Sequence, residues 1–198
     1  MARYAVAITG ASGSVYGLRL IEQLLTKGHE VIIVMTEAGR DVCGHETGFD
    51  MPAEDPARTL LRFLELPLEM PLRNACCKDL FDPIASGSYP LDGMIVCPAS
   101  MSFVAKVAHG LSDNLPSRAA DVCLKERRPL VLVPRETPLS LVHLRNMTAA
   151  VEAGAIMVPA LPAFYQGPET LDDAVNFVVG KVLDVVGVEH DLFARWGV

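Results

Sequence analysis

The sequence lacks an excess of positive charge and any apolar run long enough to cross a membrane. Its 198 residues include 17 lysines and arginines against 24 aspartates and glutamates, a formal net charge of −7. A general nucleic-acid-binding protein normally has a basic excess or a basic face, and a membrane-spanning helix needs about 20 successive apolar residues. We therefore expect neither nucleic acid nor membrane as a partner. The short apolar run after Arg3 lacks the features of a signal peptide, so we expect a cytoplasmic protein.

The sequence also lacks the cysteine and histidine spacings that build disulfide scaffolds and zinc sites. It has five cysteines, an odd number, and no Cys-x-x-Cys pair. Its five histidines stand apart from one another, without the His-Glu-x-x-His spacing of a metalloenzyme. We therefore expect reduced thiols and no bound metal ion.

Aromatic residues are few, at 6% of the chain, yet apolar residues of all kinds make up 51%. Such a high and evenly spread apolar content excludes a disordered chain. The length suits a single domain, residues 1–198, that buries about 70% of the surface of its unfolded chain.

Short, wholly apolar runs alternate with stretches of helical period. The runs predict strands at Ala5–Thr9, Val31–Met35, Met94–Cys97, Leu130–Val133 and, more weakly, Ile156–Val158. The periodic stretches predict helices at 15–25, from Glu37, at 56–64 and at 171–186. Apolar strands joined by helices predict a three-layer α/β fold, a Rossmann-like parallel sheet with helices on both faces. Ligands of such sheets bind at the carboxyl ends of the strands, near a topological switch point, so we expect the loops after these strands to lie together and to carry the chemistry.

The loop after the first strand, Thr9–Gly17, is the first candidate site. Its glycines let the backbone approach a phosphate, the following helix offers free N–H groups, and Ser12 adds a hydroxyl. A tight strand-to-helix turn explains the same residues without a ligand. A nicotinamide site, with Glu37 on a ribose hydroxyl, is disfavoured because the spacing is not Gly-x-Gly-x-x-Gly and no tyrosine has a lysine four residues later.

Two further loops are rich in hydroxyl groups. In the loop Pro98–Phe103, Ser100 is either a helix cap or a ligand contact. The segment Ala85–Pro90 reads Ala-Ser-Gly-Ser-Tyr-Pro and is predicted to be a turn.

Positive charge gathers in one segment of this acidic chain. Residues 118–145 hold six cations against three acids, net +3, which leaves −10 for the remainder. Arg118 and Lys125 lie seven residues apart, on one helix face, and Arg135 and Glu136 follow an apolar strand. Such a cluster suits a small phosphorylated substrate. The alternative, a solvated helix face with salt bridges between subunits, applies most to the pair at 127–128.

The carboxyl-terminal part of the chain contains further candidates. Tyr165 can donate to a phosphate or pack against other rings, and Lys181 lies in a mostly apolar helix, where a lysine is usually only solvated. Trp196 is the only tryptophan, and we expect the tail at about 188–198 to dock on a neighbouring subunit.

Five stretches that span nearly the whole chain, in order, resemble the flavin prenyltransferase (UbiX) family of flavodoxin-like flavoproteins. They are TGASGSVYG at 9–17, ASGSYPLDGMIVCPAS at 85–100, GLSDNLPSRAADVCLKERRPLVLVPRETPLSLVHLRNM at 110–147, GAIMVPALPAFYQGPETLDD at 154–173 and DLFARWG at 191–197. The resemblance implies transfer of a dimethylallyl group from dimethylallyl phosphate to reduced FMN without a metal ion. It also implies a dodecameric homo-oligomer and a UbiD-type decarboxylase that receives the prenylated FMN.

The same resemblance implies roles for individual residues. The implied FMN contacts are Gly10, Ala11, Ser12, Thr36, Ser100, Met101, Ser102, Phe103 and Arg118. The implied substrate contacts are Ser86, Lys125, Arg135, Tyr165 and Lys181. The implied catalytic residues are Ser12, Glu46, Lys125 and Glu136, with Glu46 linked to proton handling during ring closure and Glu136 able to protonate the leaving phosphate.

Two departures from the family pattern and two alternative functions remain. Phe103 removes a hydroxyl near the flavin, and Lys181 replaces an arginine, which loses the bidentate fork.

A cysteine-decarboxylase-type flavoprotein shares the Pro-Ala-Ser turn at 98–100, but such enzymes have a catalytic histidine and an asparagine in that turn. The other alternative is a non-catalytic FMN carrier or decarboxylase subunit.

Overall fold

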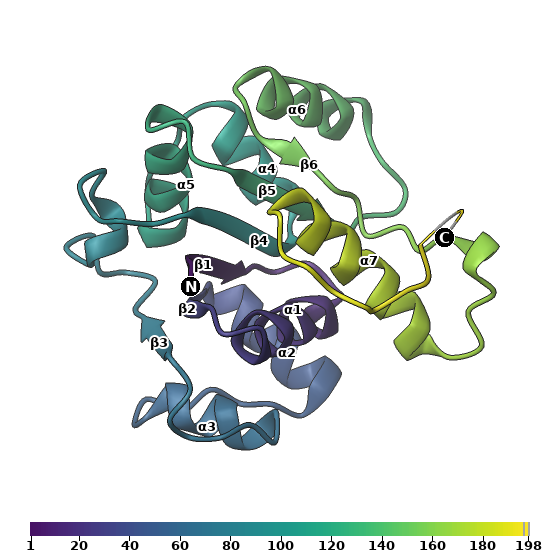
Figure 1. Ribbon diagram of the computed structural model, residues 1–198. Helices are drawn as coiled ribbons and strands as arrows, with labels where there is room; N and C mark the ends of the chain where they lie inside the picture. The colour runs from purple at the N-terminus through teal and green to yellow at the C-terminus, as the bar shows by residue number, and fades with distance from the viewer. Residues whose placement is uncertain (196, 198) are drawn as a thin grey trace.

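The structure is a computed structural model that describes residues 1–195 and 197. These residues form one sheet of six parallel strands in the order β3-β2-β1-β4-β5-β6 (Figure 1). The strands are β1 (Arg3–Ile8), β2 (Glu30–Met35), β3 (Leu72–Ala75), β4 (Gly93–Ala99), β5 (Leu130–Pro134) and β6 (Ile156–Met157). The order reverses between β1 and β4, because β2 and β3 lie on one side of β1 and the later strands on the other.

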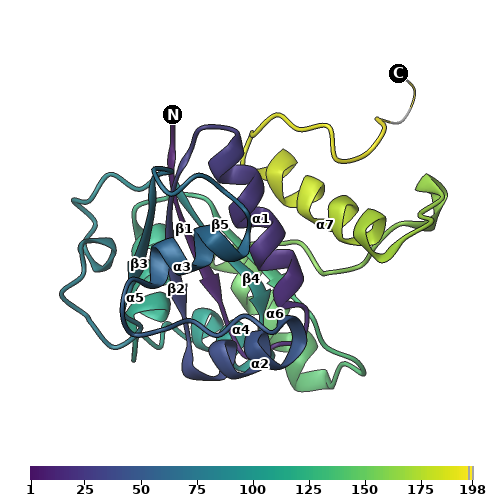
Figure 2. The same ribbon diagram turned by 90° about the horizontal axis from the view of Figure 1, so that it is seen from below.

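Helices cover both faces of this sheet (Figure 2). One face packs against α1 (Ser14–Thr26), α2 (Glu37–Thr47), α3 (Pro56–Phe63) and α7 (Leu171–Val185). The other packs against α4 (Met101–Ala108), α5 (Leu115–Lys125) and α6 (Leu141–Glu152). Short 3-10 turns occur at Pro83–Ala85 and Phe164–Gln166. The predicted three-layer α/β fold is therefore confirmed.

Strand β1 illustrates why the predicted apolar runs are strands. Tyr4, Val6 and Ile8 enter the core beneath α1 and α7, whereas Ala5 and Ala7 face α4 and α5. Both faces of the strand are buried, so the sequence shows no alternation of polar and apolar residues. All five predicted strands are present, with ends within two residues of those expected.

Strand β3 is the element that the sequence analysis missed. It is four residues long at the edge of the sheet, and Arg73 and Asn74 form its centre. A half-buried edge strand this short shows neither an apolar run nor a clear alternation. The omission matters, because the residues after β3 contribute to the candidate site.

No helix in the described ranges is long and apolar enough to cross a membrane.

Candidate functional site

The loops after β1 and β4 are joined directly at the point where the strand order reverses. The Thr9 hydroxyl donates to the Pro98 carbonyl over 2.9 Å and accepts from the Ser100 N–H over 2.8 Å. The Thr9 N–H also donates to the Pro98 carbonyl, at 3.2 Å. These bonds fix the floor of a crevice at the carboxyl ends of the strands, the position at which open α/β sheets bind ligands.

A first cavity, of about 410 Å³, opens on one side of the loop Thr9–Gly13. Among the predicted flavin contacts, Gly10, Thr36, Ser100, Ser102 and Phe103 line it. Thr36 and Ser100 cap the amino ends of α2 and α4 by accepting the N–H groups of residues 39 and 103, which confirms the cap interpretation of Ser100. The cavity therefore combines hydroxyl groups with two helix amino termini, a favourable setting for an anion.

Gly10 brings the backbone close to the first cavity. A Cβ atom at this position would lie 2.6 Å from Cβ of Ala38, so any larger residue would displace the start of α2. By contrast, the side chains of Ala11 and Met101 are each only 6% exposed and belong to the interior. Contacts of these two residues with a ligand would have to come from their backbone atoms.

The sequence analysis overlooked several residues of the first cavity. Lys106 Nζ lies 2.7–2.8 Å from the Asp113 carboxylate, and both side chains line the cavity together with Cys77, Lys78 and Asn114. Two of these residues follow the missed strand β3. The other available signal was the Asp-Asn pair at 113–114, in which Asn114 caps the amino end of α5.

A second cavity, of about 440 Å³, adjoins the later part of the same loop, Ser12 and Gly13. Ser12, Tyr16, Glu46 and Arg135 line it, with apolar residues from the start of α7. Arg135 Nε donates to the Ser12 carbonyl over 3.0 Å. This bond uses one of the five guanidinium N–H groups and holds the cation beside the glycine-rich loop.

Glu46 occupies the amino end of α1. Its carboxylate accepts the N–H of Gly13 at 3.0 Å and the N–H of Ser14 at 2.8 Å. Burial opposes the charge, but the Ser12 hydroxyl and these two N–H groups outweigh burial, so the pKa of Glu46 is lowered below its usual value of 4.5. The N–H groups that we expected to be free for a phosphate are thus already bound to a carboxylate.

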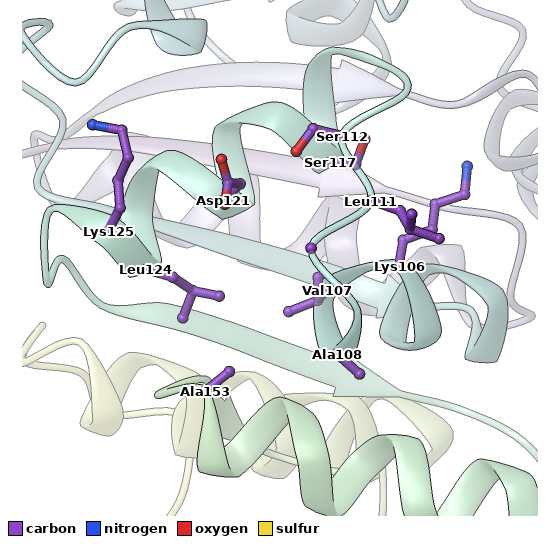
Figure 3. Close-up of a pocket in the computed structure, with 11 residues that line it drawn as sticks. Lys106, Val107, Ala108, Leu111, Ser112, Ser117, Asp121, Leu124, Lys125 and Ala153 are labelled. Atoms are coloured by element: carbon purple, nitrogen blue, oxygen red, sulfur yellow. The ribbon is translucent and has the colours of Figure 1, made fainter.

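A second group of predicted site residues surrounds α5. Arg118 binds Asp121 at 2.7 Å and donates from Nε to the Ala85 carbonyl at 3.2 Å. Lys125 forms an ion pair with Glu126. Lys125 lines a third cavity, of about 380 Å³, between α4, α5 and the end of α6, with Lys106 at its opposite side and Asp121 between them (Figure 3).

The structure does not bring the two groups together within one chain. Lys125 ends α5 before β5 begins, whereas Arg135 directly follows the carboxyl end of β5. The five-residue strand alone separates the two positions by about 16 Å. Ser86, which precedes β4, lies with Lys125 at the amino edge of the sheet. The loops after the strands thus lie together, as expected, but Ser86 and Lys125 lie outside them in a single chain.

The remaining predicted substrate contacts are also dispersed. Lys181 lies ten residues into α7, about 15 Å along the helix from its start beside the second cavity, and it pairs with Asp184 at 3.3 Å. Tyr165 is 63% exposed and packs edge-on against Phe177. Glu136 is exposed and lines a small cavity of about 140 Å³ with Arg135.

The described part of the carboxyl-terminal tail packs on its own chain. Phe193 and His190 lie against Gly180 of α7, and Arg195 forms an ion pair with Asp184 at 2.7 Å. Trp196, on which the predicted docking partly depends, lies outside the described residues. Docking of the tail on a neighbouring subunit stays a prediction.

The described chain contains no cluster of three or more histidine, cysteine or acidic side chains that could hold a metal ion. Its anion-binding groups are instead hydroxyls, N–H groups and fixed cations around a strand-end crevice, which are the groups that bind a phosphate-bearing ligand.

Comparison with known proteins identifies the class and the family. A family model described as Flavoprotein matches residues 2–183, so the chain is an α/β flavoprotein with a flavodoxin-like fold. The flavin prenyltransferase UbiX of Alkalihalophilus pseudofirmus is 48% identical over 192 residues, which cover 97% of this chain and 94% of that protein. The chain belongs to the flavin prenyltransferase (UbiX) family, and it is accordingly a transferase.

Two solved structures of the same family match closely. The crystal structure of AnUbiX (PadA1) in complex with FMN and dimethylallyl pyrophosphate gives a TM-score of 0.88 at 37% identity and covers 99% of this chain and 97% of that one. The dodecameric FMN-dependent UbiX-like decarboxylase from Escherichia coli O157:H7 gives 0.86 at 41% identity, with 98% of both chains covered. The cysteine decarboxylase SpaF, at 20% identity and a TM-score of 0.56, shares the fold alone.

Proposed function

We propose that this chain binds reduced FMN in the first cavity and transfers to it the dimethylallyl group of dimethylallyl phosphate. The observation that carries the proposal is that successive parts of the loop Thr9–Gly13 line two cavities. Gly10 lines the first cavity, and Ser12, only two residues later, lines the second with Arg135 and Glu46. A ligand in each cavity would thus meet the other across a few atoms of backbone.

The first cavity fits the phosphate end of FMN. Hydroxyl groups of Thr36, Ser100 and Ser102 and the amino ends of two helices line it, together with the ammonium of Lys106, which is paired with Asp113. The missing Cβ at Gly10 leaves room for a close approach of backbone and ligand. When bound, reduced FMN supplies an electron-rich ring to which an allyl group can become attached. We assign Ala11, Met101, Phe103 and Arg118 to the same binding function.

The second cavity supports departure of the allylic phosphate. Breaking the allylic C–O bond builds negative charge on the phosphate, and a fixed guanidinium such as that of Arg135 stabilises this charge. The bond to the Ser12 carbonyl orients this guanidinium before the reaction. We assign donation of a proton to the leaving phosphate to Glu136, which follows Arg135 in sequence and lines the small neighbouring cavity with it.

We assign proton acceptance to Glu46. Its lowered pKa keeps the carboxylate charged at neutral pH, and the Ser12 hydroxyl lies beside it. Two backbone N–H groups hold its oxygen atoms in place, so the carboxylate can accept a proton from a ligand in the second cavity without moving far.

We further propose that complete sites form between copies of this chain. Lys125 and Ser86 lie at the opposite edge of the sheet from Arg135, and Lys181 lies about 15 Å along α7 from the second cavity, so a neighbouring copy would have to supply these groups. We assign Tyr165 to the same shared site. The dodecameric state of the relative from Escherichia coli supports a large homo-oligomer here. A UbiD-type decarboxylase is the expected recipient of the prenylated flavin.

The test is direct. The purified protein is incubated with reduced FMN and dimethylallyl phosphate without air, and the flavin mass is measured. We expect a gain of one C5 unit. Unchanged flavin beside an active control enzyme would contradict the proposal and would favour an FMN carrier. Release of carbon dioxide from a cysteine-ending peptide under oxidising conditions would instead indicate a cysteine decarboxylase.

A further inference from the structure

The segment Ala85–Pro90, which we call the serine segment, is held through its carbonyl groups by three arginines. Arg3 binds the last carbonyl, that of Pro90, at 3.2 Å, and the other two arginines hold the part that contains the serines. Arg118 Nε donates to the Ala85 carbonyl at 3.2 Å. The two terminal nitrogens of Arg128 donate to the carbonyls of Gly87 and Tyr89, at 2.7 and 2.8 Å. The guanidinium fork of Arg128 thus bridges the backbone on either side of Ser88, a geometry that a planar, two-pronged donor can satisfy and a point charge cannot.

The turn that ends α5 orients the side chain of Arg128 towards this segment. Arg127 adopts a left-handed conformation, with φ of 56°, and its N–H donates to the Leu124 carbonyl. The Arg128 N–H then reaches back to the Cys123 carbonyl at 2.8 Å. These two bonds form a Schellman-type helix end. The chain reverses there, so Arg128 is half-buried against the serine segment while the side chain of Arg127 is exposed.

The serine segment carries a predicted substrate contact and touches another. The Ser86 and Ser88 hydroxyls lie 2.9 Å apart. Gly87 packs directly on the Lys125–Glu126 ion pair, because a Cβ atom at Gly87 would lie 2.7 Å from Lys125 Nζ. Displacement of the segment would therefore move Ser86 and release the contact that confines Lys125.

We propose that Arg128 is a positioning residue for substrate binding: it fixes the serine segment and thereby places Ser86 and Lys125 to receive the phosphate of the allylic substrate. The proposal rests on the function proposed above. Arg128 itself binds backbone carbonyls and contacts no substrate. The neighbouring Arg127 has the same charge, and its side chain forms no hydrogen bond or ion pair with any residue of 1–195 or 197, so it offers a matched control.

Kinetics of three variants test this role. Arg128→Ala should raise KM for dimethylallyl phosphate about tenfold, with kcat and FMN affinity changed less than about threefold. Arg128→Lys, which keeps the charge but can bind only one carbonyl well, should give an intermediate KM. Arg127→Ala should remain within about twofold of the wild type. Equal increases of KM in Arg127→Ala and Arg128→Ala would show that only the positive charge matters and would contradict the positioning role. An unchanged KM in Arg128→Ala would also contradict it.

Hydrogen–deuterium exchange without substrate separates this inference from the proposed function. Arg128→Ala should accelerate exchange of the amides at 86–89, with α5 and the sheet unchanged, whereas Arg127→Ala should not. If Arg128→Ala fails to fold, Arg128→Lys provides the comparison. Unaltered exchange in the serine segment would refute the positioning role even in an active enzyme. If the wild-type protein fails to prenylate FMN, the proposed function is refuted. The exchange experiment would still show whether Arg128 fixes the serine segment.

Discussion

At the scale of single residues, the most consequential contact is the one between Glu46 and the amino end of α1. A carboxylate at a helix amino terminus is stabilised by the helix dipole and by hydrogen bonds from otherwise unpaired N–H groups. Here the same carboxylate is also the proposed proton acceptor. Its hydrogen bonds therefore couple the geometry of the loop Thr9–Gly13 to the charge of one side chain.

The contribution of Glu46 to stability should depend on pH in a defined direction. Because its pKa is lowered on folding, the stabilising contribution is present above the unfolded-state pKa of 4.5 and is lost as the pH falls through the lower folded-state value. Glu46→Gln should lower the melting temperature at about pH 7, and the difference from wild type should narrow towards about pH 4. Thermal unfolding at a series of pH values measures this. A difference that is constant with pH would contradict the assignment.

Substitution of the cations proposed to bind the substrate phosphate should lower prenyl transfer without weakening FMN binding. Neither Arg135 nor Lys125 lines the first cavity, and both are proposed to bind the leaving phosphate, so Arg135→Ala and Lys125→Ala should each lower turnover by at least about 100-fold while FMN remains bound. Turnover is followed by flavin mass and binding by fluorescence titration. Loss of FMN in either variant would mean that the residue serves the flavin and not the allylic phosphate.

At the scale of elements, the site depends on how closely helices approach the strand ends. Gly39 lies in the first turn of α2, and a Cβ atom there would lie 2.3 Å from the Ile8 carbonyl at the end of β1. Gly44 lies in the same helix, and its added Cβ would meet nothing closer than the Phe49 carbonyl at 3.6 Å. The helix therefore contains a glycine that is required for packing and one that is not.

Alanine substitutions at these two glycines should act in opposite directions. Gly39→Ala should destabilise the protein by about 1–3 kcal/mol and weaken FMN binding, because α2 and its cap Thr36 must move away from β1. Gly44→Ala should stabilise by about 0.5–1 kcal/mol, since alanine loses less backbone entropy in a helix. Denaturant unfolding measures both. A neutral Gly39→Ala would show that the contact of α2 with β1 can relax.

At the scale of the whole molecule, the separation of Lys125 from Arg135 makes the oligomer part of the proposed enzyme. Sites shared between copies predict complementation between two inactive variants. When Lys125→Ala and Arg135→Ala subunits are mixed in equal amounts and allowed to exchange, about a quarter of the sites should contain both wild-type residues.

The mixture should therefore recover activity that neither variant has alone. Mixing two preparations of Arg135→Ala provides the control, which should stay inactive. Flavin mass after dissociation and reassociation is the measurement. Persistent inactivity of exchanged mixed oligomers would place both residues in one chain's site, against the distance between them in this structure.

The sequence by itself determined the layers and the chemical inventory of this protein. Runs such as Val31–Met35 are apolar on every residue because both faces of the sheet are covered, and this pattern is local enough to be read without coordinates. The glycine-rich loop and the cap at Ser100 are equally local. The family resemblance added the expectation that the ligands are FMN and an allylic phosphate.

Only the tertiary structure decided which of these residues meet. Pairing of Glu46 with the amino end of α1, or of Arg128 with the serine segment, joins positions more than 30 residues apart, and no periodicity encodes such a contact. The sequence pattern did not predict the edge strand β3, because this strand is short and half-buried. The separation of Lys125 from Arg135 follows from the direction of one strand, β5, which places the end of α5 and the start of the next loop at opposite edges of the sheet.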